Sequence, residues 1–293
     1  MRHDGTTVNA LTVDVEDWFQ VSAFADCIDP SAWDRFVPRV DRNTRRLLDL
    51  FDRKGVKGTF FVLGWVAERQ KDLIREIDAA GHEVACHGWS HQLVYNQERS
   101  VFRDETRRSK SLLEDIVGKP VLGYRAASYS VTGDSLWALD ELVDAGFVYD
   151  SSIFPVRHDR YGIPDGERWP HAMKTPSGAE LVEFPLSTAR RAGMNLPVAG
   201  GGYFRLYPYG VTRWGLQSVN EEGGPFIFYM HPWEVDPGQP RVPAASWKSK
   251  FRHYTGLEGC EGKLERLLGD FRFGTCRDVL AGLRLLEAPA AWT

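Results

Sequence analysis

Short apolar runs alternate with amphipathic stretches along most of the chain. We predict buried strands at residues 10–15, 58–63, 83–86, 121–124, 147–149 and 225–230. We predict amphipathic helices at residues 43–54, 66–80, 99–117, 134–145 and 208–220. A glycine directly follows most of these helices, as expected of a helix end. Strands that alternate with helices at this spacing indicate parallel β–α units, and therefore an α/β protein.

The last part of the chain has a different pattern. Residues 237–243 contain three prolines and are predicted to form a loop. Short helices are predicted at 262–268 and 275–287, and the second begins with a capping-box pattern. We therefore predict a main domain at 1–236 and a C-terminal helical extension at 237–293 that packs on it.

Ionisable side chains directly follow five of the predicted strands. They are Asp14, Glu16, Asp17, His87, His91, Arg125, Asp150 and His231. The carboxyl ends of parallel strands meet at one edge of a sheet or barrel, which is where such folds form their sites. Polar residues without a common role would be scattered over the helices as well. The sequence therefore predicts a functional site at this edge.

His87 and His91 lie four residues apart, in a turn that follows a strand. With a carboxylate from the first strand they make a ligand set of two imidazoles and one carboxylate, which leaves positions open for water and substrate. We predict a divalent metal at this site, with Zn²⁺ as the first choice and Co²⁺, Ni²⁺, Fe²⁺ or Mn²⁺ as alternatives. The HExxH pattern of zinc proteases is not present, because the histidine after His82 follows it by five residues.

Composition narrows the class of protein only a little further. The 293 residues are 43% hydrophobic and 26% charged, which is typical of a globular protein. The net charge of −4 gives no reason to expect a nucleic acid as partner. The four cysteines lack CxxC spacing, and no apolar stretch reaches the roughly 20 residues of a membrane span. We see no signal segment and expect a cytoplasmic protein of unassigned oligomeric state.

The motifs at the strand ends resemble, in order, those of the polysaccharide deacetylases, the NodB-homology enzymes of carbohydrate esterase family 4. Gly81 to His91 resembles the family's GHxxxxHxxxH signature. The other matching stretches are Val13–Trp18 for the TFDD motif, Gly58–Val62 for the TFF strand, Tyr124–Ala126 for R-x-P, Tyr149–Ser152 for the aspartate motif and Tyr229–His231 for the final motif. Residues 14–21 and 231–241 further resemble the subgroup associated with exopolysaccharide export and exosortase loci. The resemblance covers roughly residues 10–235.

The resemblance implies a distorted, incomplete (β/α) barrel and an enzyme that removes N-acetyl groups from an amino-sugar glycan with the help of a metal. It implies that His87 and His91 are metal ligands. It implies that His231 is the general acid for the leaving amine. Arg125 would orient the general base, and Asp150 would orient His231.

Three acids occupy the place of the family's aspartate pair. Alignment of an adjacent pair makes Glu16 the base and Asp17 the metal ligand. Alignment of a D-x-D variant makes Asp14 the base and Glu16 the ligand. We favour Asp17 as the ligand and Asp14 as the base. Ala127 stands where the family has the proline of R-x-P, so the shape of that loop is left open.

Several aromatic residues near the predicted strand ends are candidates for stacking on sugar rings. They are Trp89, Tyr129, Tyr203 and Trp233. We interpret the glycine-rich stretch 200–205 as a flexible rim loop. Three other functions stay open: hydrolysis of a small cyclic amide such as allantoin, glycan binding without catalysis, and an iron oxygenase, which uses the same kind of ligand set.

Overall fold

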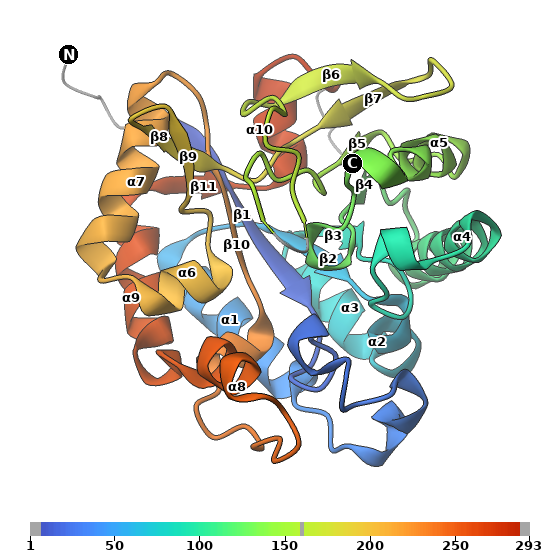
Figure 1. Ribbon diagram of the computed structural model, residues 1–293, viewed down its shortest axis with the longest axis vertical. Coiled ribbons are helices and arrows are strands. Elements are labelled where there is room, and N and C mark those ends of the chain that lie inside the picture. Colours follow the sequence, from blue (N-terminus) through green and yellow to red (C-terminus); the bar gives the residue numbers. More distant parts are fainter. Residues whose placement is uncertain (1–6, 159–160, 288–293) are drawn as a thin grey trace.

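The computed structural model describes residues 7–158 and 161–287, and its centre is one mostly parallel β-sheet (Figure 1). The strands are β1 (Val8–Val15), β2 (Thr59–Val62), β3 (Glu83–Cys86), β4 (Gly123–Tyr124), β5 (Tyr149–Asp150), β6 (His171–Lys174), β7 (Glu180–Glu183), β8 (Thr188–Arg191), β9 (Met194–Pro197), β10 (Ile227–Met230) and β11 (Arg272–Gly274). The strand order is β10-β1-β2-β3-β4-β5-β7-β6, and only β6 and β7 pair antiparallel in this sheet. Strands β8 and β9 form a separate antiparallel pair.

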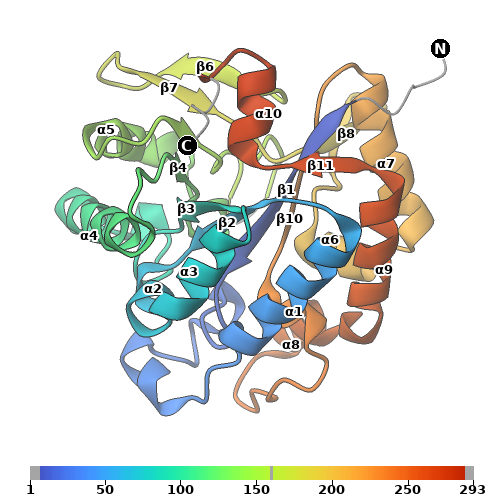
Figure 2. The same cartoon turned by 180° about the vertical axis from the view of Figure 1, so that it is seen from behind.

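Helices pack around the sheet and at its ends. They are α1 (Val40–Lys54), α2 (Gly64–Arg69), α3 (Lys71–Ala79), α4 (Arg99–Val117), α5 (Trp137–Asp144), α6 (Gly201–Leu206), α7 (Tyr209–Glu221), α8 (Trp247–Tyr254), α9 (Leu257–Asp270) and α10 (Cys276–Gly282). Figure 2 shows α1, α2 and α3 across one side of the sheet, with α9 beside α1. Among the described residues, no helix is both long and apolar enough to cross a bilayer.

The sheet is an incomplete barrel, as predicted. Strands β10 and β6 are the two ends of its strand order, and the sheet of the described residues does not close between them. Strand β11 also joins the sheet, because it pairs with β1 at Val8 to Ala10. The α/β fold class and the distorted, incomplete barrel are therefore confirmed. The predicted domain boundary at residue 236 stays a prediction.

Glycines end two of the predicted helices as expected. Gly55 and Gly118 follow α1 and α4 with φ of 63° and 70°, a left-handed conformation that other residues adopt only with strain. The predicted helix 66–80 is instead divided into α2 and α3, because Gln70 has non-helical angles (φ −126°, ψ 45°). The interpretation of residues 200–205 as a loop was wrong, since most of them form α6.

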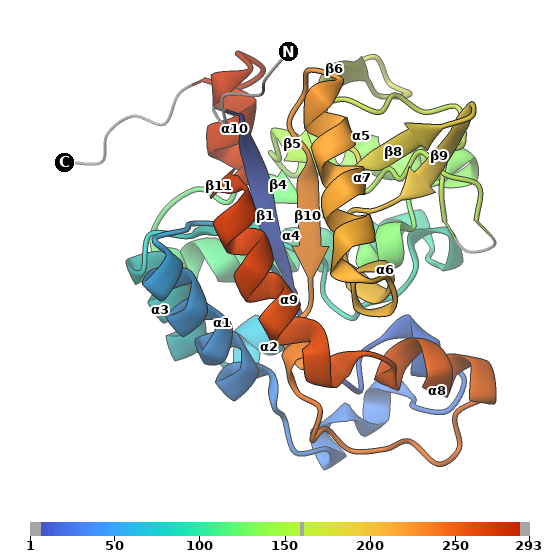
Figure 3. The same cartoon turned by 90° about the vertical axis from the view of Figure 1, so that its left-hand side faces the viewer.

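The carboxyl ends of the central strands lie at the same end of the molecule. Figure 3 shows β1 and β10 side by side and pointing toward α8 and the segment that follows β1. Helix α10 lies near the opposite end of β1 (Figure 1). The side chains predicted to act together therefore project toward the end of the molecule where α8 lies.

Candidate active site

Alternate residues of β1 face opposite sides of the sheet. Leu11, Val13 and Val15 pack in the largest apolar cluster, whereas Asp14 faces the interior of the incomplete barrel, where Arg125 lies. Arg125 follows β4 and is fully buried, and its Nη1 donates a hydrogen bond of 2.7 Å to Asp14 Oδ1. The structure thus brings Arg125 to the carboxylate that we favoured as the base.

Asp150 does not contact His231, and the prediction that it orients that histidine was wrong. Its Oδ1 accepts a hydrogen bond of 2.6 Å from Ser152, and its carboxyl group interacts with the buried carboxyl group of Glu183. Burial raises the pKa of Asp150 to about 6 and raises that of Glu183 well above its usual range, which favours a shared proton between them. The neighbouring residue, Ser151, accepts hydrogen bonds from Arg125. Asp150 therefore lies in the segment that holds the Arg125 side chain in place.

A second group of side chains has the composition of a metal site. One ligand atom each from Glu16, His87 and His91 lies within 4.8 Å of the others. Glu16 directly follows β1, and the two histidines follow β3 on a turn in which Gly88 has φ 73°. Two imidazoles and one carboxylate suit a divalent first-row metal and leave coordination positions for water and substrate.

Two observations support the fit of a cation to this group. Glu16 Oε2 lies 2.7 Å from His91 Nε2, and the two side chains are almost completely buried, with 2% and 4% exposed. A carboxylate oxygen and an imidazole nitrogen at this distance can share a proton or bind one cation, and both are common metal ligands. His91 also has a positive φ of 52°, a strained conformation that proteins retain mainly at functional sites.

The imidazole of His87 is neutral, and one of its nitrogens is free to bind a metal ion. Its Nδ1 lies 2.8 Å from the carbonyl oxygen of Arg125, so Nδ1 carries the proton and Nε2 keeps its lone pair. Burial lowers the pKa of His87 to about 4, against the opposing effect of the Asp14 and Glu16 charges. Burial opposes ionisation of Glu16, but His91, His231 and His87 outweigh it and hold the pKa of this carboxyl well below its usual range.

Asp17 lies outside the metal-ligand group, and the prediction that it is the third ligand was wrong. Its carboxylate accepts hydrogen bonds from the backbone N–H groups of Trp18, Arg39 and Val40. The last two are at the start of α1, where backbone donors have no partner inside the helix. Asp17 therefore caps a helix, and Glu16 is the acid that lies with His87 and His91, which agrees with the D-x-D alignment.

His231 lies opposite the acids of β1, as predicted, but Glu234 is the residue that orients it. His231 Nε2 lies 3.6 Å from Glu16 Oε1 and 4.0 Å from Asp14 Oδ2. Its Nδ1 lies 3.1 Å from Glu234 Oε2, and Glu234 Oε1 accepts a hydrogen bond of 2.5 Å from the buried Arg205. Burial lowers the pKa of His231, but the nearby carboxylates outweigh it and raise this pKa to about 9.

Glu234 and Arg205 were missed in the sequence. Glu234 follows His231 by three residues, the spacing of a capping box, and its side chain also accepts a bond from the backbone N–H of His231. That spacing was a usable signal. Arg205 comes from α6 and had no such signal, because nothing in its local sequence relates it to residue 234.

The site opens into a cleft of about 460 Å³. Its lining includes Asp14, Glu16, His87, His91 and His231, together with Tyr129, Tyr203 and Trp233 from the predicted sugar-stacking set. Trp89 is not among the residues that line this cleft, and its ring instead contacts the Arg108 guanidinium at 3.4 Å. Trp233 is buried, stacks with the rings of His231 and His253, and donates a hydrogen bond of 3.1 Å to Glu16.

The loop that lacks the expected proline has an unusual backbone. Ser128 and Tyr129 follow Ala127 with φ of 51° and 55°, which is uncommon for residues other than glycine. This conformation places the Tyr129 hydroxyl 3.4 Å from Asp14 Oδ2. The strain thus accompanies a contact with the oxygen of Asp14 that Arg125 leaves free.

Two family models match adjoining parts of the chain. Residues 31–145 match a model described as polysaccharide deacetylase, and residues 151–281 match a domain of unknown function, DUF3473. The first segment contains Arg125 and both histidines of the metal-ligand group. The second contains His231 and Glu234. The acids at the end of β1 precede both segments, so neither match includes them.

Curated relatives match over part of their length. Peptidoglycan deacetylase of Helicobacter pylori is 30% identical over 124 residues, which are 42% of this chain and 41% of the relative. The peptidoglycan deacetylase-like protein FGM2 of Gibberella zeae is 29% identical over 174 residues, 55% of this chain and 50% of the relative. The chain therefore spans no more than half the length of these relatives.

Solved structures share the fold over nearly the whole chain. A proposed polysaccharide deacetylase from Mycobacterium smegmatis has a TM-score of 0.61 at 20% identity and covers 99% of this chain and 97% of its own. The allantoinase PuuE has a TM-score of 0.59 at 13% identity, with 94% and 91% covered. At these identities the likeness shows the fold alone. Residues 31–145 and the curated relatives thus show similarity to polysaccharide deacetylases over part of this chain.

Proposed function

We propose that this protein is a metal-dependent hydrolase that removes acetyl groups from the amino sugars of a glycan. The proposal rests chiefly on one observation: the group formed by Glu16, His87 and His91 lies in the same cleft as Asp14 and His231. Such a set provides a cation site, a base and an acid, which amide hydrolysis requires. The relatives named as peptidoglycan deacetylases support an N-acetylated sugar as the substrate.

The residues divide the proton transfers between them. When bound, a divalent ion lowers the pKa of a water molecule and polarises the acetamide carbonyl. Asp14 accepts a proton from the attacking water through Oδ2, because Arg125 already engages Oδ1. His231 donates its Nε2 proton to the nitrogen of the leaving amine. The 4.0 Å between Asp14 Oδ2 and His231 Nε2 allows one reacting carbon to lie within reach of both groups.

Removal of divalent ions is expected to abolish the activity. After treatment with a chelator, acetate release from N-acetylglucosamine oligomers should fall to background, because ionised Glu16 and neutral His87 then lack the cation for which they are arranged. Addition of Zn²⁺, Co²⁺, Ni²⁺, Fe²⁺ or Mn²⁺ in separate reactions should restore it and identify the preferred metal. Elemental analysis of each sample measures the bound ion. Full activity in a sample shown to be free of metal would contradict the proposal.

The same assay tests the three other functions that the sequence left open. A panel of substrates that includes allantoin and related ureides tests the cyclic-amide alternative. The likeness to the allantoinase PuuE concerns the fold and says nothing about the substrate of this chain. Oligomer binding without acetate release from any member of the panel would support the non-catalytic alternative. Turnover without oxygen would exclude the oxygenase alternative.

We also propose that Glu234 positions the acid. Glu234→Gln should lower kcat about 10- to 100-fold and leave KM nearly unchanged, because the amide keeps a hydrogen bond but loses the charge that stabilises protonated His231. It should also lower the free energy of unfolding by about 3 kcal/mol, since the buried Arg205 loses its ion partner. Steady-state kinetics and urea unfolding measure the two effects.

Asp150→Asn is the matched control for Glu234→Gln. It also replaces a buried carboxyl group, but one that does not contact His231. We expect its kcat to fall less than that of Glu234→Gln. If the loss in kcat were larger for Asp150→Asn, the assignment of Glu234 would be wrong.

The resemblance to the exopolysaccharide subgroup leads us to propose a role in the synthesis of such a polymer. The two stretches that resemble this subgroup meet at the site, where Trp233 contacts Glu16. Deletion of the gene should alter the degree of acetylation of the polymer. Cytoplasmic localisation stays a prediction, and cell fractionation tests it.

A further inference from the structure

The segment that contains α8 differs in charge from the rest of the chain. Residues 237–257 contain four basic residues and no acidic residue, whereas the whole chain has a net charge of −4. The basic residues are Arg241, Lys248, Lys250 and Arg252. Within residues 7–158 and 161–287, none of these side chains forms an ion pair with a carboxylate. Lys250 Nζ donates a hydrogen bond to the carbonyl oxygen of Pro243, and the Arg241 guanidinium lies over the Tyr254 ring, so these contacts leave the positive charges without a neutralising carboxylate.

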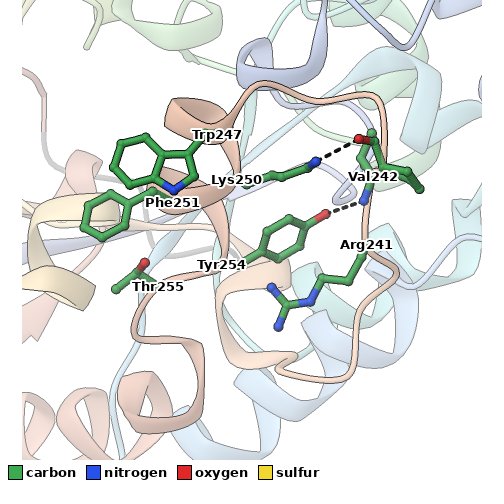
Figure 4. A pocket seen from close by; sticks show the side chains of 8 residues that line it. Arg241, Val242, Trp247, Lys250, Phe251, Tyr254 and Thr255 are labelled. Carbon is green, nitrogen blue, oxygen red and sulfur yellow. Dashed lines mark hydrogen bonds between the residues drawn. The ribbon is translucent and has the colours of Figure 1, made fainter.

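Two large aromatic rings lie exposed on the same segment. Trp247 is 78% exposed and Phe251 is 47% exposed, and they lie one helical turn apart on α8. Their ring centroids are 5.7 Å apart and the rings are nearly parallel, at 20° (Figure 4). Apolar rings gathered on the surface of a folded protein commonly mark a binding site, because their hydration is unfavourable.

These rings connect the cleft to a second hollow. Trp247 and Phe251 line the cleft that contains Asp14 and His231. They also line a hollow of about 420 Å³, whose lining includes Arg241 (Figure 4). Lys250 lines this hollow as well, and Lys248 and Arg252 line the cleft. A ligand that extends out of the cleft toward α8 would thus lie near two rings and four basic residues.

We propose that α8 binds further sugar units of an anionic glycan whose acetylated unit lies in the cleft. This inference rests on the proposed function and adds the chemical class of the polymer. The C–H face of a sugar ring packs on an aromatic ring while its hydroxyl groups stay in water. Lys248, Lys250 and Arg252 attract the carboxylate or phosphate groups of such a polymer. An anionic membrane surface has similar chemistry, but the continuity with the cleft favours the glycan.

Binding of defined oligosaccharides to the metal-loaded full chain tests the inference. Isothermal titration calorimetry compares hyaluronan oligosaccharides, which alternate N-acetylglucosamine with a uronic acid, with neutral N-acetylglucosamine oligomers of the same length. The acidic oligomer should bind more tightly, and the difference should shrink as salt is added. Trp247→Ala should weaken the binding of both oligomers about tenfold. The double variant Lys248→Gln/Arg252→Gln should weaken binding of the acidic oligomer selectively.

Matched variants control for loss of an exposed ring or charge. Trp214 is 42% exposed on α7 and lines neither hollow, and Lys71 is exposed on α3. Trp214→Ala and Lys71→Gln should bind both oligomers as the wild type does. Equal binding of the acidic and neutral oligomers by the wild type would overturn the inference, as would an unchanged affinity of Trp247→Ala.

Two further outcomes are distinguishable. If Trp247→Ala abolished binding to phosphatidylglycerol vesicles but no oligosaccharide bound to the wild type, the occupant would be a membrane and the inference would be wrong. If the oligomers bound as expected but the metal-loaded wild type released acetate from none of them, the inference on α8 would be supported and the proposed function would not.

Discussion

Replacement of Glu16 by glutamine is expected to remove the divalent ion from the site and to lower acetate release about 10³-fold. Glu16 is the carboxylate that meets His87 and His91, and an amide offers a cation no negative charge. Stabilisation of the transition state by a metal amounts to several kcal/mol, which corresponds to a loss of this size. Elemental analysis of the purified variant measures the bound ion, and an acetate assay measures turnover.

Asp17→Asn is the control for Glu16→Gln, because it makes the same chemical change one residue further along. It should retain the metal and most of the activity. Its free energy of unfolding should fall by about 1 kcal/mol, because Asp17 caps α1 through the N–H groups of Arg39 and Val40. If Asp17→Asn lost the metal and Glu16→Gln kept it, the ligand assignment made here would be reversed.

Replacement of His231 by alanine is expected to leave the metal in place and to lower kcat about 10² to 10⁴-fold. His231 lies across the cleft from the metal-ligand group and contacts Glu16 and Asp14 only at 3.6 and 4.0 Å. It is the group that can protonate a poor leaving group such as an amine, and loss of a general acid has an effect of this size. Its raised pKa keeps it protonated at neutral pH.

Two comparisons distinguish a role of His231 as general acid from a general effect of removing a histidine. His171→Ala removes a histidine on β6, far along the strand order from β10, and should keep full turnover. An ester analogue of the acetamide has a better leaving group, so His231→Ala should lose less activity on the ester than on the amide. Equal losses on the two substrates, or wild-type turnover on the amide, would contradict a role as general acid.

Local patterns in the sequence were enough for most of the regular structure near the site. The apolar strands at β1, β2 and β3 and the helices α1 and α4 were predicted, because burial on one or both faces and glycine at helix ends are properties of adjacent residues. His87 and His91, which are close in sequence, were likewise predicted to act together, and they lie in one group with Glu16. The antiparallel pair β8–β9 was not predicted, since its residues lack a strong alternation.

The roles of the acids at the end of β1 could not be assigned from the local sequence. Asp14, Glu16 and Asp17 lie within four positions, and the sequence alone allowed several assignments. The structure distinguishes the three acids by the direction of their side chains. Asp14 and Glu16 face the cleft, whereas Asp17 points to the start of α1. That choice depends on a helix terminus more than twenty residues away, which no local pattern contains.

The sequence by itself determined which residues can perform the chemistry: two spaced histidines, acids at the end of a strand, an arginine and a histidine after two later strands. The tertiary structure alone decided which of them meet. In the structure, Glu16 and not Asp17 lies with the two histidines, and Glu234 and not Asp150 contacts His231. Arg205 and α8, which come from distant parts of the chain, also line the cleft. The physical reason is that side-chain type and strand ends are local properties, whereas hydrogen-bond partners of buried charges are set by packing between distant segments.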